Sequence, residues 1–185
     1  SIVFGSEFIL KIYRKIAPGQ NPECELLSCL KKNTPRLHGY LEYKKANTLP
    51  YTIGNLQHFI AQSQSGWQYA QTLPQADAFA TLLGTRTAEM HLALSAAFEP
   101  EDFSLLYQRS RFQALQNQIH QVWRQLAQAT PQPLITQLLA QEKQVLAIAQ
   151  KITKHKYAAK KIRIHGDFHL GQILFDGHDI TIIDF

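Results

Sequence analysis

The sequence predicts an α+β fold: an antiparallel sheet with one helix, followed by a mainly helical part. Two patterns support this prediction. Within residues 1–60, short apolar runs of strand length are separated by turn signals, whereas from about residue 74 to residue 149 apolar residues recur at intervals of three and four. Short apolar runs return near the end of the chain. We therefore expect two parts, residues 1–60 and residues 61–185.

The first part begins with a predicted hairpin. Residues 2–4 and 8–13 are its apolar arms, and Gly5-Ser6 is the turn between them. Two further strands are predicted at residues 38–43 and 51–60.

A helix is predicted between the hairpin and the later strands. Asn21 is a typical N-cap, Pro22 suits the first helical position, and an acidic residue follows in the first turn. We expect this helix to extend to about Lys31, with an apolar face formed by Leu26, Leu27 and Leu30.

Three amphipathic helices are predicted in the middle of the chain. The first runs from Pro74 to about Ala97, the second carries the apolar stripe from Phe112 to Leu126, and the third covers residues 134–149. The Pro-containing segment 130–133 separates the last two. The end of the chain then predicts short strands at residues 162–164, 173–175 and 180–183, with a tight turn at Asp176-Gly177.

Composition excludes several classes of protein. The 185 residues include 45% apolar and 18% charged side chains, as in globular rather than disordered proteins. Two cysteines do not form a disulfide framework, and no apolar run is long enough for a transmembrane helix. We expect a cytoplasmic protein without a membrane partner. Because the chain starts and stops within apparent strands, we also expect it to be a fragment of a longer protein.

The net charge of +5 raises the question of a nucleic-acid partner. Six basic residues cluster within residues 151–163: Lys151, Lys154, Lys156, Lys160, Lys161 and Arg163. No aromatic residues are interleaved with them in a recognised binding pattern. We therefore interpret the cluster as a solvated helix end and expect no nucleic-acid partner.

The densest group of polar residues is segment 164–174, IHGDFHLGQIL. Apolar residues bound it on both sides, and its two glycines allow the backbone to turn sharply. Asp184 follows the next predicted strand. Asp167, Gln172 and Asp184 are thus expected at the ends of neighbouring strands, where they can converge.

Such a convergence suits phosphoryl transfer. Asp167 would deprotonate an acceptor hydroxyl, while the oxygens of Gln172 and Asp184 would bind Mg²⁺. Lys11, on an early strand, would bind the phosphates. An acidic partner is needed to hold its ammonium group. We expect that partner to be Glu25, with Glu23 pointing elsewhere because residues two apart do not share a helix face.

A metal-dependent hydrolase is the competing interpretation of the same loop. His165, Asp167 and His169 could serve as three metal ligands, although no second ligand motif accompanies them. We expect instead that His165 braces the loop by hydrogen bonds. Arg86, Glu89 and His91, on a predicted helix, either approach a substrate or brace the catalytic loop, and we favour bracing.

The segment HGDFHLGQ (165–172), followed by IIDF (182–185), resembles the catalytic and metal-binding segments of aminoglycoside-phosphotransferase-like kinases. Most members have Asn where this chain has Gln172, and the Gln variant is similar to the maltokinase branch. Further stretches resemble that branch: FILKIYR (8–14), GQNPECE (19–25), GWQY (66–69), LGTRTAEMH (83–91) and FEPEDF (98–103).

The resemblance implies a bilobed protein-kinase-like fold, incomplete at both termini here, with ATP and Mg²⁺ as cofactors. Asp167 would be the catalytic base, Gln172 and Asp184 the Mg²⁺ ligands, and Lys11 with Glu25 the phosphate-binding pair. Residues 56–60 would form the hinge that binds adenine through backbone groups.

The implied reaction transfers the γ-phosphate of ATP to the anomeric hydroxyl of maltose, a step in α-glucan (glycogen) and trehalose metabolism. A fused or associated trehalose synthase is an implied partner. Two alternatives stay open: a related kinase acting on an aminoglycoside or another sugar, and a non-catalytic kinase-like module.

Overall fold

The computed structural model describes residues 1–73, 77–130, 132–155 and 157–185. It divides into two compact units, residues 1–99 with 162–185 (unit 1) and residues 100–161 (unit 2). The predicted division between residues 60 and 61 remains a prediction. Among the described residues, no helix is both long and apolar enough to span a bilayer.

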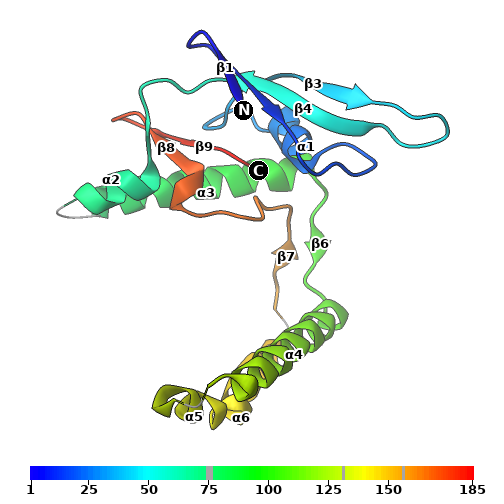
Figure 1. The fold of residues 1–185 in the computed structure, drawn as a ribbon, viewed down its shortest axis with the longest axis vertical. Coiled ribbons are helices and arrows are strands. Elements are labelled where there is room, and N and C mark those ends of the chain that lie inside the picture. The colour runs from blue at the N-terminus through cyan, green and yellow to red at the C-terminus, as the bar shows by residue number, and fades with distance from the viewer. Residues whose placement is uncertain (74–76, 131, 156) are drawn as a thin grey trace. The chain divides into compact units, whose positions relative to one another are not determined.

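Unit 1 contains a four-stranded antiparallel sheet in the order β1-β2-β4-β3 (Figure 1). Its strands are β1 (Ile2–Phe4), β2 (Phe8–Ile12), β3 (Leu37–Tyr43) and β4 (Tyr51–His58). The predicted hairpin is confirmed as β1 and β2, and the two later strands form within two residues of the predicted limits. In the register of β2 with β4, Lys11 lies opposite Asn55.

Helix α1 (Pro22–Cys29) follows the hairpin, as its capping sequence predicts. The Asn21 side chain accepts a hydrogen bond from the Glu23 backbone N–H at 2.9 Å, and Pro22 occupies the first turn. Leu26 and Leu27 are buried. The helix ends before Lys31 because Leu30 adopts an extended conformation while its N–H still bonds to the Leu26 carbonyl.

A second sheet completes unit 1, in the order β5 (Gln64–Ser65), β8 (Ile173–Phe175) and β9 (Ile180–Ile182). Strand β8 contacts α2 (Gly66–Thr72), and β9 contacts α3 (Asp77–Ala97) (Figure 1). The predicted start of this last helix, Pro74, lies outside the described residues.

The hydrophobic core of unit 1 joins α1, α3 and the second sheet. Its buried members are Leu26, Leu30, Phe79, Met90, Leu94, Ile173, Phe175, Ile180 and Ile182. Tyr69 of α2 stacks on Phe175 with ring centroids 4.2 Å apart. This packing fixes the ends of β8 and β9, where the predicted site residues begin.

Unit 2 is mainly helical and closes with a short strand pair. Its elements are β6 (Glu101–Asp102), α4 (Leu105–Gln128), α5 (Pro133–Leu139), α6 (Glu142–Gln150), a 3₁₀ turn at Lys151–Thr153 and β7 (Lys160–Lys161). The antiparallel pair β6–β7 brings Glu101 to Lys161 and Asp102 to Lys160 as ion pairs.

Two predictions fail in or beside this unit. The single helix expected over residues 134–149 is two helices that break at Ala140-Gln141, where the Leu139 carbonyl accepts from the Trp123 indole at 3.3 Å. The strand expected at residues 162–164 is absent from the described structure there, because pairing with β6 stops at Lys161. The predictions for Pro131 and Lys156 concern residues outside those described.

Candidate active site

The loop that joins Ile164 to β8 is braced by His165, as expected. The His165 ring is buried, and its Nε2 lies 2.8 Å from the Ile183 carbonyl oxygen. Since a carbonyl only accepts, Nε2 donates, and Nδ1 accepts from the Asp167 backbone N–H at 3.4 Å. Both ring nitrogens are therefore used within the chain, which argues against His165 as a metal ligand. Among the described residues, no group of three or more His, Cys, Asp or Glu could hold a metal ion.

Asp167 presents its carboxylate to solvent. Its side chain is 82% exposed and lies 3.9 Å from His169 Nε2. The Nδ1 atom of His169 accepts from the Gly171 backbone N–H at 3.0 Å, so the ring turns Nε2 toward Asp167. A Cβ at Gly171 would lie 2.7 Å from His169 Cε1, so a larger residue there would displace the His169 ring.

Gln172 and Asp184 lie at neighbouring strand ends. Gln172 ends the 3₁₀ helix Leu170–Gln172 directly before β8, and Ile183 directly after β9 donates its N–H to the Gln172 carbonyl at 2.9 Å. Asp184 then adopts the left-handed conformation with φ of 59°. Such backbone conformations are uncommon for residues other than glycine and cluster at functional sites.

Lys11 connects the two sheets of unit 1. Its Nζ donates to Glu23 Oε1 at 2.5 Å and to Asp184 Oδ1. Burial disfavours the charge of this ammonium, but the carboxylates of Glu23 and Asp184 outweigh burial and raise the pKa of Lys11 above its ordinary value. Lys11 is therefore a fixed cation beside Asp184.

The expected partnership of Lys11 with Glu25 is wrong, since Glu23 occupies that place. Glu25 instead pairs with Arg163 at 2.6 Å, and both side chains are well exposed. The physical reason is helix phase: Glu23 precedes Leu26, Leu27 and Leu30 by three, four and seven positions and shares their buried face. The spacing of these leucines is the signal in the sequence that could have identified Glu23 as the partner of Lys11.

A cavity of about 190 Å³ lies at this junction within unit 1. Lys11 and Asp184 contribute its charged groups, and Ile9, Ile60 and Leu174 contribute apolar surface. Of the expected hinge, Leu56 to His58 belong to β4, and the N–H groups of His58 and Phe59 donate to the carbonyls of Arg36 and Glu7. The backbone of the hinge is thus held in place by the first sheet.

The oxygens at this site suit a hard divalent cation. Asp184 offers a half-exposed carboxylate. Gln172 lies directly before the adjoining strand, and its side-chain nitrogen is 3.4 Å from His169 Nε2. Carboxylate and amide oxygens are the ligands that Mg²⁺ prefers, and Mg²⁺ bound to substrate phosphates needs only one or two of them from the protein. The residues present therefore fit Mg²⁺.

Comparison with known proteins identifies the family. The model of APH, the phosphotransferase enzyme family, matches residues 4–185. The chain belongs to this family. Three solved structures of glucosamine kinase share its fold: crystal form B (TM-score 0.75, 21% identity), a complex with glucosamine, ADP and inorganic phosphate (0.73, 21%) and crystal form A (0.72, 20%).

These matches cover 100%, 99% and 97% of this chain but 47%, 46% and 44% of the respective glucosamine kinase chains. The chain therefore spans less than half the length of the structures it matches. At this identity the likeness shows the fold, and it confirms the predicted α+β, kinase-like class.

In this member of the family, Arg86 braces the turn between β8 and β9 rather than the loop 165–172. Its guanidinium donates to both Asp179 carboxylate oxygens at 2.8 Å and to Glu89 at 2.8 Å. Asn33 also donates to Asp179, at 3.1 Å. The hydrogen bonds from Arg86 hold the pKa of Asp179 below its usual value. The turn that precedes β9, and hence Asp184, is thereby tied to α3.

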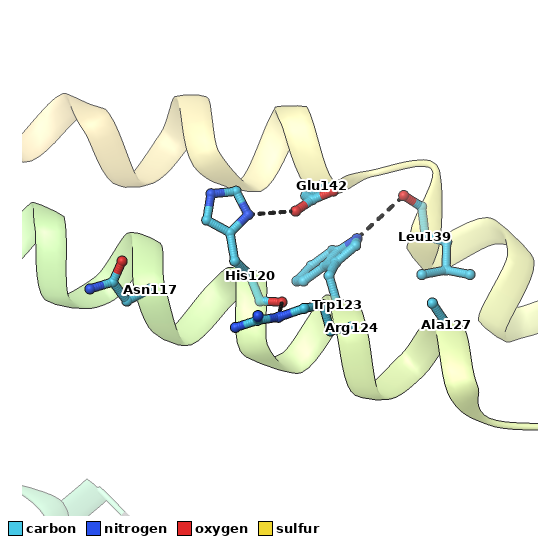
Figure 2. A pocket seen from close by; sticks show the side chains of 7 residues that line it. All are labelled: Asn117, His120, Trp123, Arg124, Ala127, Leu139 and Glu142. Carbon is cyan, nitrogen blue, oxygen red and sulfur yellow. Dashed lines mark hydrogen bonds and ion pairs between the residues drawn. The ribbon is translucent and has the colours of Figure 1, made fainter.

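A larger hollow, of about 640 Å³, lies in unit 2 (Figure 2). His120 pairs with Glu142 at 2.9 Å, and Arg124 Nε donates to the His120 carbonyl at 3.3 Å. These polar groups therefore bond to one another within the helical unit. None of the predicted site residues lines it. We therefore interpret it as a feature of helix packing, not as the candidate active site. Its lining residues are Asn117, His120, Trp123, Arg124, Ala127, Leu139 and Glu142.

The sequence analysis missed three residues around Glu23: Tyr13, Asn55 and Gln57. All three side chains donate hydrogen bonds to its carboxylate. The available signal was the spacing on β4: Asn55 and Gln57 are two residues apart, so both amides lie on the same face of the strand.

The basic residues near residue 160 are largely engaged in ion pairs. Lys160 and Lys161 pair with Asp102 and Glu101, and Arg163 pairs with Glu25. Three of the six basic residues in segment 151–163 are thus held in ion pairs. The absence of a nucleic-acid partner stays a prediction.

Proposed function

We propose that this chain carries the nucleotide-binding and catalytic residues of an ATP-dependent sugar kinase. The observation that carries the proposal is Lys11, which bonds to both Glu23 and Asp184 beside the Asp167 loop. The shared fold of a glucosamine kinase that binds ADP supports it. Family membership supports transfer of a phosphoryl group to a hydroxyl.

Each residue has a proposed role in the reaction. Lys11, held by Glu23, binds the ATP phosphates. Gln172 and Asp184 would hold Mg²⁺, which would neutralise charge on the phosphate oxygens. Asp167 takes the proton of the acceptor hydroxyl as its oxygen forms the bond to the γ-phosphorus. The bond from that phosphorus to the bridging oxygen breaks, and ADP leaves. The cavity bounded by Ile60 and Leu174 accommodates adenine next to the hinge.

We propose maltose as the acceptor, phosphorylated at its anomeric hydroxyl. The resemblance of segment 165–172, with Gln172, to the maltokinase branch supports this choice, as do the further matching stretches. A cytoplasmic role in α-glucan metabolism, with a fused or associated trehalose synthase, remains part of the same prediction. Glucosamine or another amino sugar is the second candidate, since the matching solved structures are glucosamine kinases.

Phosphorus NMR of the full-length protein with MgATP separates these acceptors. Maltose, glucosamine, glucose and an aminoglycoside are supplied in parallel. A new anomeric sugar-phosphate signal with maltose alone supports the maltose proposal. A signal with glucosamine alone retains the kinase and replaces the acceptor, and transfer to none of the four contradicts the proposed sugar kinase.

A further inference from the structure

The carboxylate of Glu23 is buried, with 5% of the residue exposed. Within the described part of the chain, four side chains donate hydrogen bonds to it. Its Oε1 accepts from Lys11 at 2.5 Å and from Gln57 at 2.8 Å. Its Oε2 accepts from Tyr13 at 2.9 Å and from Asn55 at 3.0 Å. Both oxygens are therefore fixed, and three of the four donors are uncharged.

The donors come from one face of the first sheet. Lys11 lies opposite Asn55 and Ile9 opposite Gln57 in the β2–β4 register, while Tyr13 extends β2 through a backbone bond to Ile53. Paired residues of antiparallel strands share a face, so the donors converge on the first turn of α1. This arrangement is built by the sheet and does not depend on a flexible loop.

Burying these polar donors lowers the stability of the fold unless each of them finds an acceptor, which the Glu23 carboxylate supplies. Asn55 is 0% and Gln57 1% exposed, and burial of an amide is unfavourable unless hydrogen bonds replace those with water. Apolar side chains at these positions would pack without that cost. Tyr13 keeps its proton and stays a donor, because burial and the neighbouring Glu23 raise its pKa.

The geometry points to a role beyond packing. Lys11 links Glu23 to Asp184, and its ammonium must keep its position when phosphate oxygens arrive. A carboxylate held only by Lys11 would move with it. The three neutral donors hold Glu23 independently of Lys11.

We propose that Tyr13, Asn55 and Gln57 are positioning residues that fix the Glu23 carboxylate, and through it Lys11, for a nucleotide phosphate. The proposal rests on the proposed function, in which Lys11 binds the ATP phosphates. None of the three is a catalytic residue. They act through Glu23.

Calorimetric titration of the full-length protein with MgADP tests the proposal. Gln57→Met keeps the length of the side chain and removes the hydrogen-bond donor to Glu23. We expect MgADP to bind roughly tenfold more weakly, as is usual when a residue that orients a binding residue is lost. Gln108→Met is the matched control, because Gln108 is equally buried but donates to the Phe103 carbonyl. We expect its affinity to match the wild type, and unchanged affinity in Gln57→Met would overturn the proposal.

A double-mutant cycle separates positioning from direct contact, since Gln57 also lines the cavity. In a Lys11→Met background, Gln57→Met is expected to cause no further loss of MgADP affinity. A further tenfold loss would show that Gln57 acts independently of Lys11 and would overturn the proposal. If Gln57→Met does not fold, Tyr13→Phe, which removes one hydroxyl, takes its place in the same cycle.

The outcomes also distinguish this proposal from the proposed function. MgADP binding that depends on Lys11 but not on Gln57 or Tyr13 overturns the positioning role alone. Wild-type protein that binds no MgADP, or binds it equally well as Lys11→Met, overturns both.

Discussion

Lys11 connects parts of the candidate site that lie far apart in the sequence. Its Nζ bonds to Glu23 and Asp184, residues separated from it by 12 and 173 positions. The types of residue at the site could be predicted from sequence, because carboxylates, an amide and a lysine next to strands suit phosphoryl transfer. The partner of Lys11 was predicted wrongly, because it depends on which face of α1 meets the sheet.

Glu23 and Glu25 form a matched pair for testing that correction. We expect Glu23→Gln to raise KM for MgATP about tenfold, because Lys11 loses its buried carboxylate, and to lower the free energy of unfolding by about 1–3 kcal/mol. Glu25→Gln loses only an exposed ion pair with Arg163, so the free energy of unfolding should change by no more than about 1 kcal/mol. Steady-state kinetics and urea unfolding measure both. A larger effect of Glu25→Gln on KM would restore the original assignment.

Asp184 offers a test of the proposed Mg²⁺ site. Asn tolerates the left-handed conformation that Asp184 adopts at φ of 59°, so Asp184→Asn removes the charge without backbone strain. We expect the Mg²⁺ concentration for half-maximal activity to rise about tenfold. Asp77→Asn, on the exposed start of α3, is the control. An unaltered Mg²⁺ titration in Asp184→Asn would remove this residue from the site.

At the scale of elements, the fold is most predictable where local signals are strong. The N-terminal cap of α1 and the short apolar runs at β2 and β4 predicted these elements within a few residues. The break between α5 and α6 was not predictable, because it coincides with a contact between Trp123 and Leu139 that depends on tertiary packing. The inward amides of β4 were missed for the same reason, because the carboxylate to which they donate belongs to Glu23 of another element, α1.

Two glycines test how closely α2 packs against β8. A Cβ at Gly66 of α2 would lie 2.9 Å from Ile173 Cβ and 3.0 Å from the Leu170 carbonyl oxygen, so Gly66→Ala should destabilise the fold by about 1–3 kcal/mol. Gly84 of α3 has no atom within 4 Å of the same position, so Gly84→Ala should stabilise it by about 0.5–1 kcal/mol. Chemical denaturation measures both. Equal effects of the two substitutions would contradict the close contact of α2 with β8.

The ion pair of Arg86 with Asp179 predicts a pH dependence. Because the folded-state pKa of Asp179 is depressed, its contribution to stability is present above the unfolded-state value, about 3.9, and is lost as the pH falls below it. Asp179→Asn should therefore be less stable than the wild type at pH 7, and the difference should shrink near pH 3. Urea unfolding at both values measures it. A difference independent of pH would mean that the charge of Asp179 does not stabilise the turn.

For the molecule as a whole, every predicted site residue belongs to unit 1, which residues 1–99 and 162–185 form together. Lys11 and Asp184 come from the two ends of the sequence and bond to each other there. The convergence of Asp167 and Gln172 on this pair stays a prediction. The choice of sugar was not predictable from physical reasoning, since Asp167 would activate any suitably placed hydroxyl.

Comparison of wild-type protein with Asp167→Asn tests the central claim most directly. The full-length protein is incubated with MgATP and a panel of sugars, and phosphorylated sugar is measured by mass spectrometry beside MgADP affinity. We predict that Asp167→Asn binds MgADP like the wild type but transfers phosphate about 10²–10⁴-fold more slowly, the range that general-base catalysis supplies. Transfer by Asp167→Asn at the wild-type rate would contradict the account.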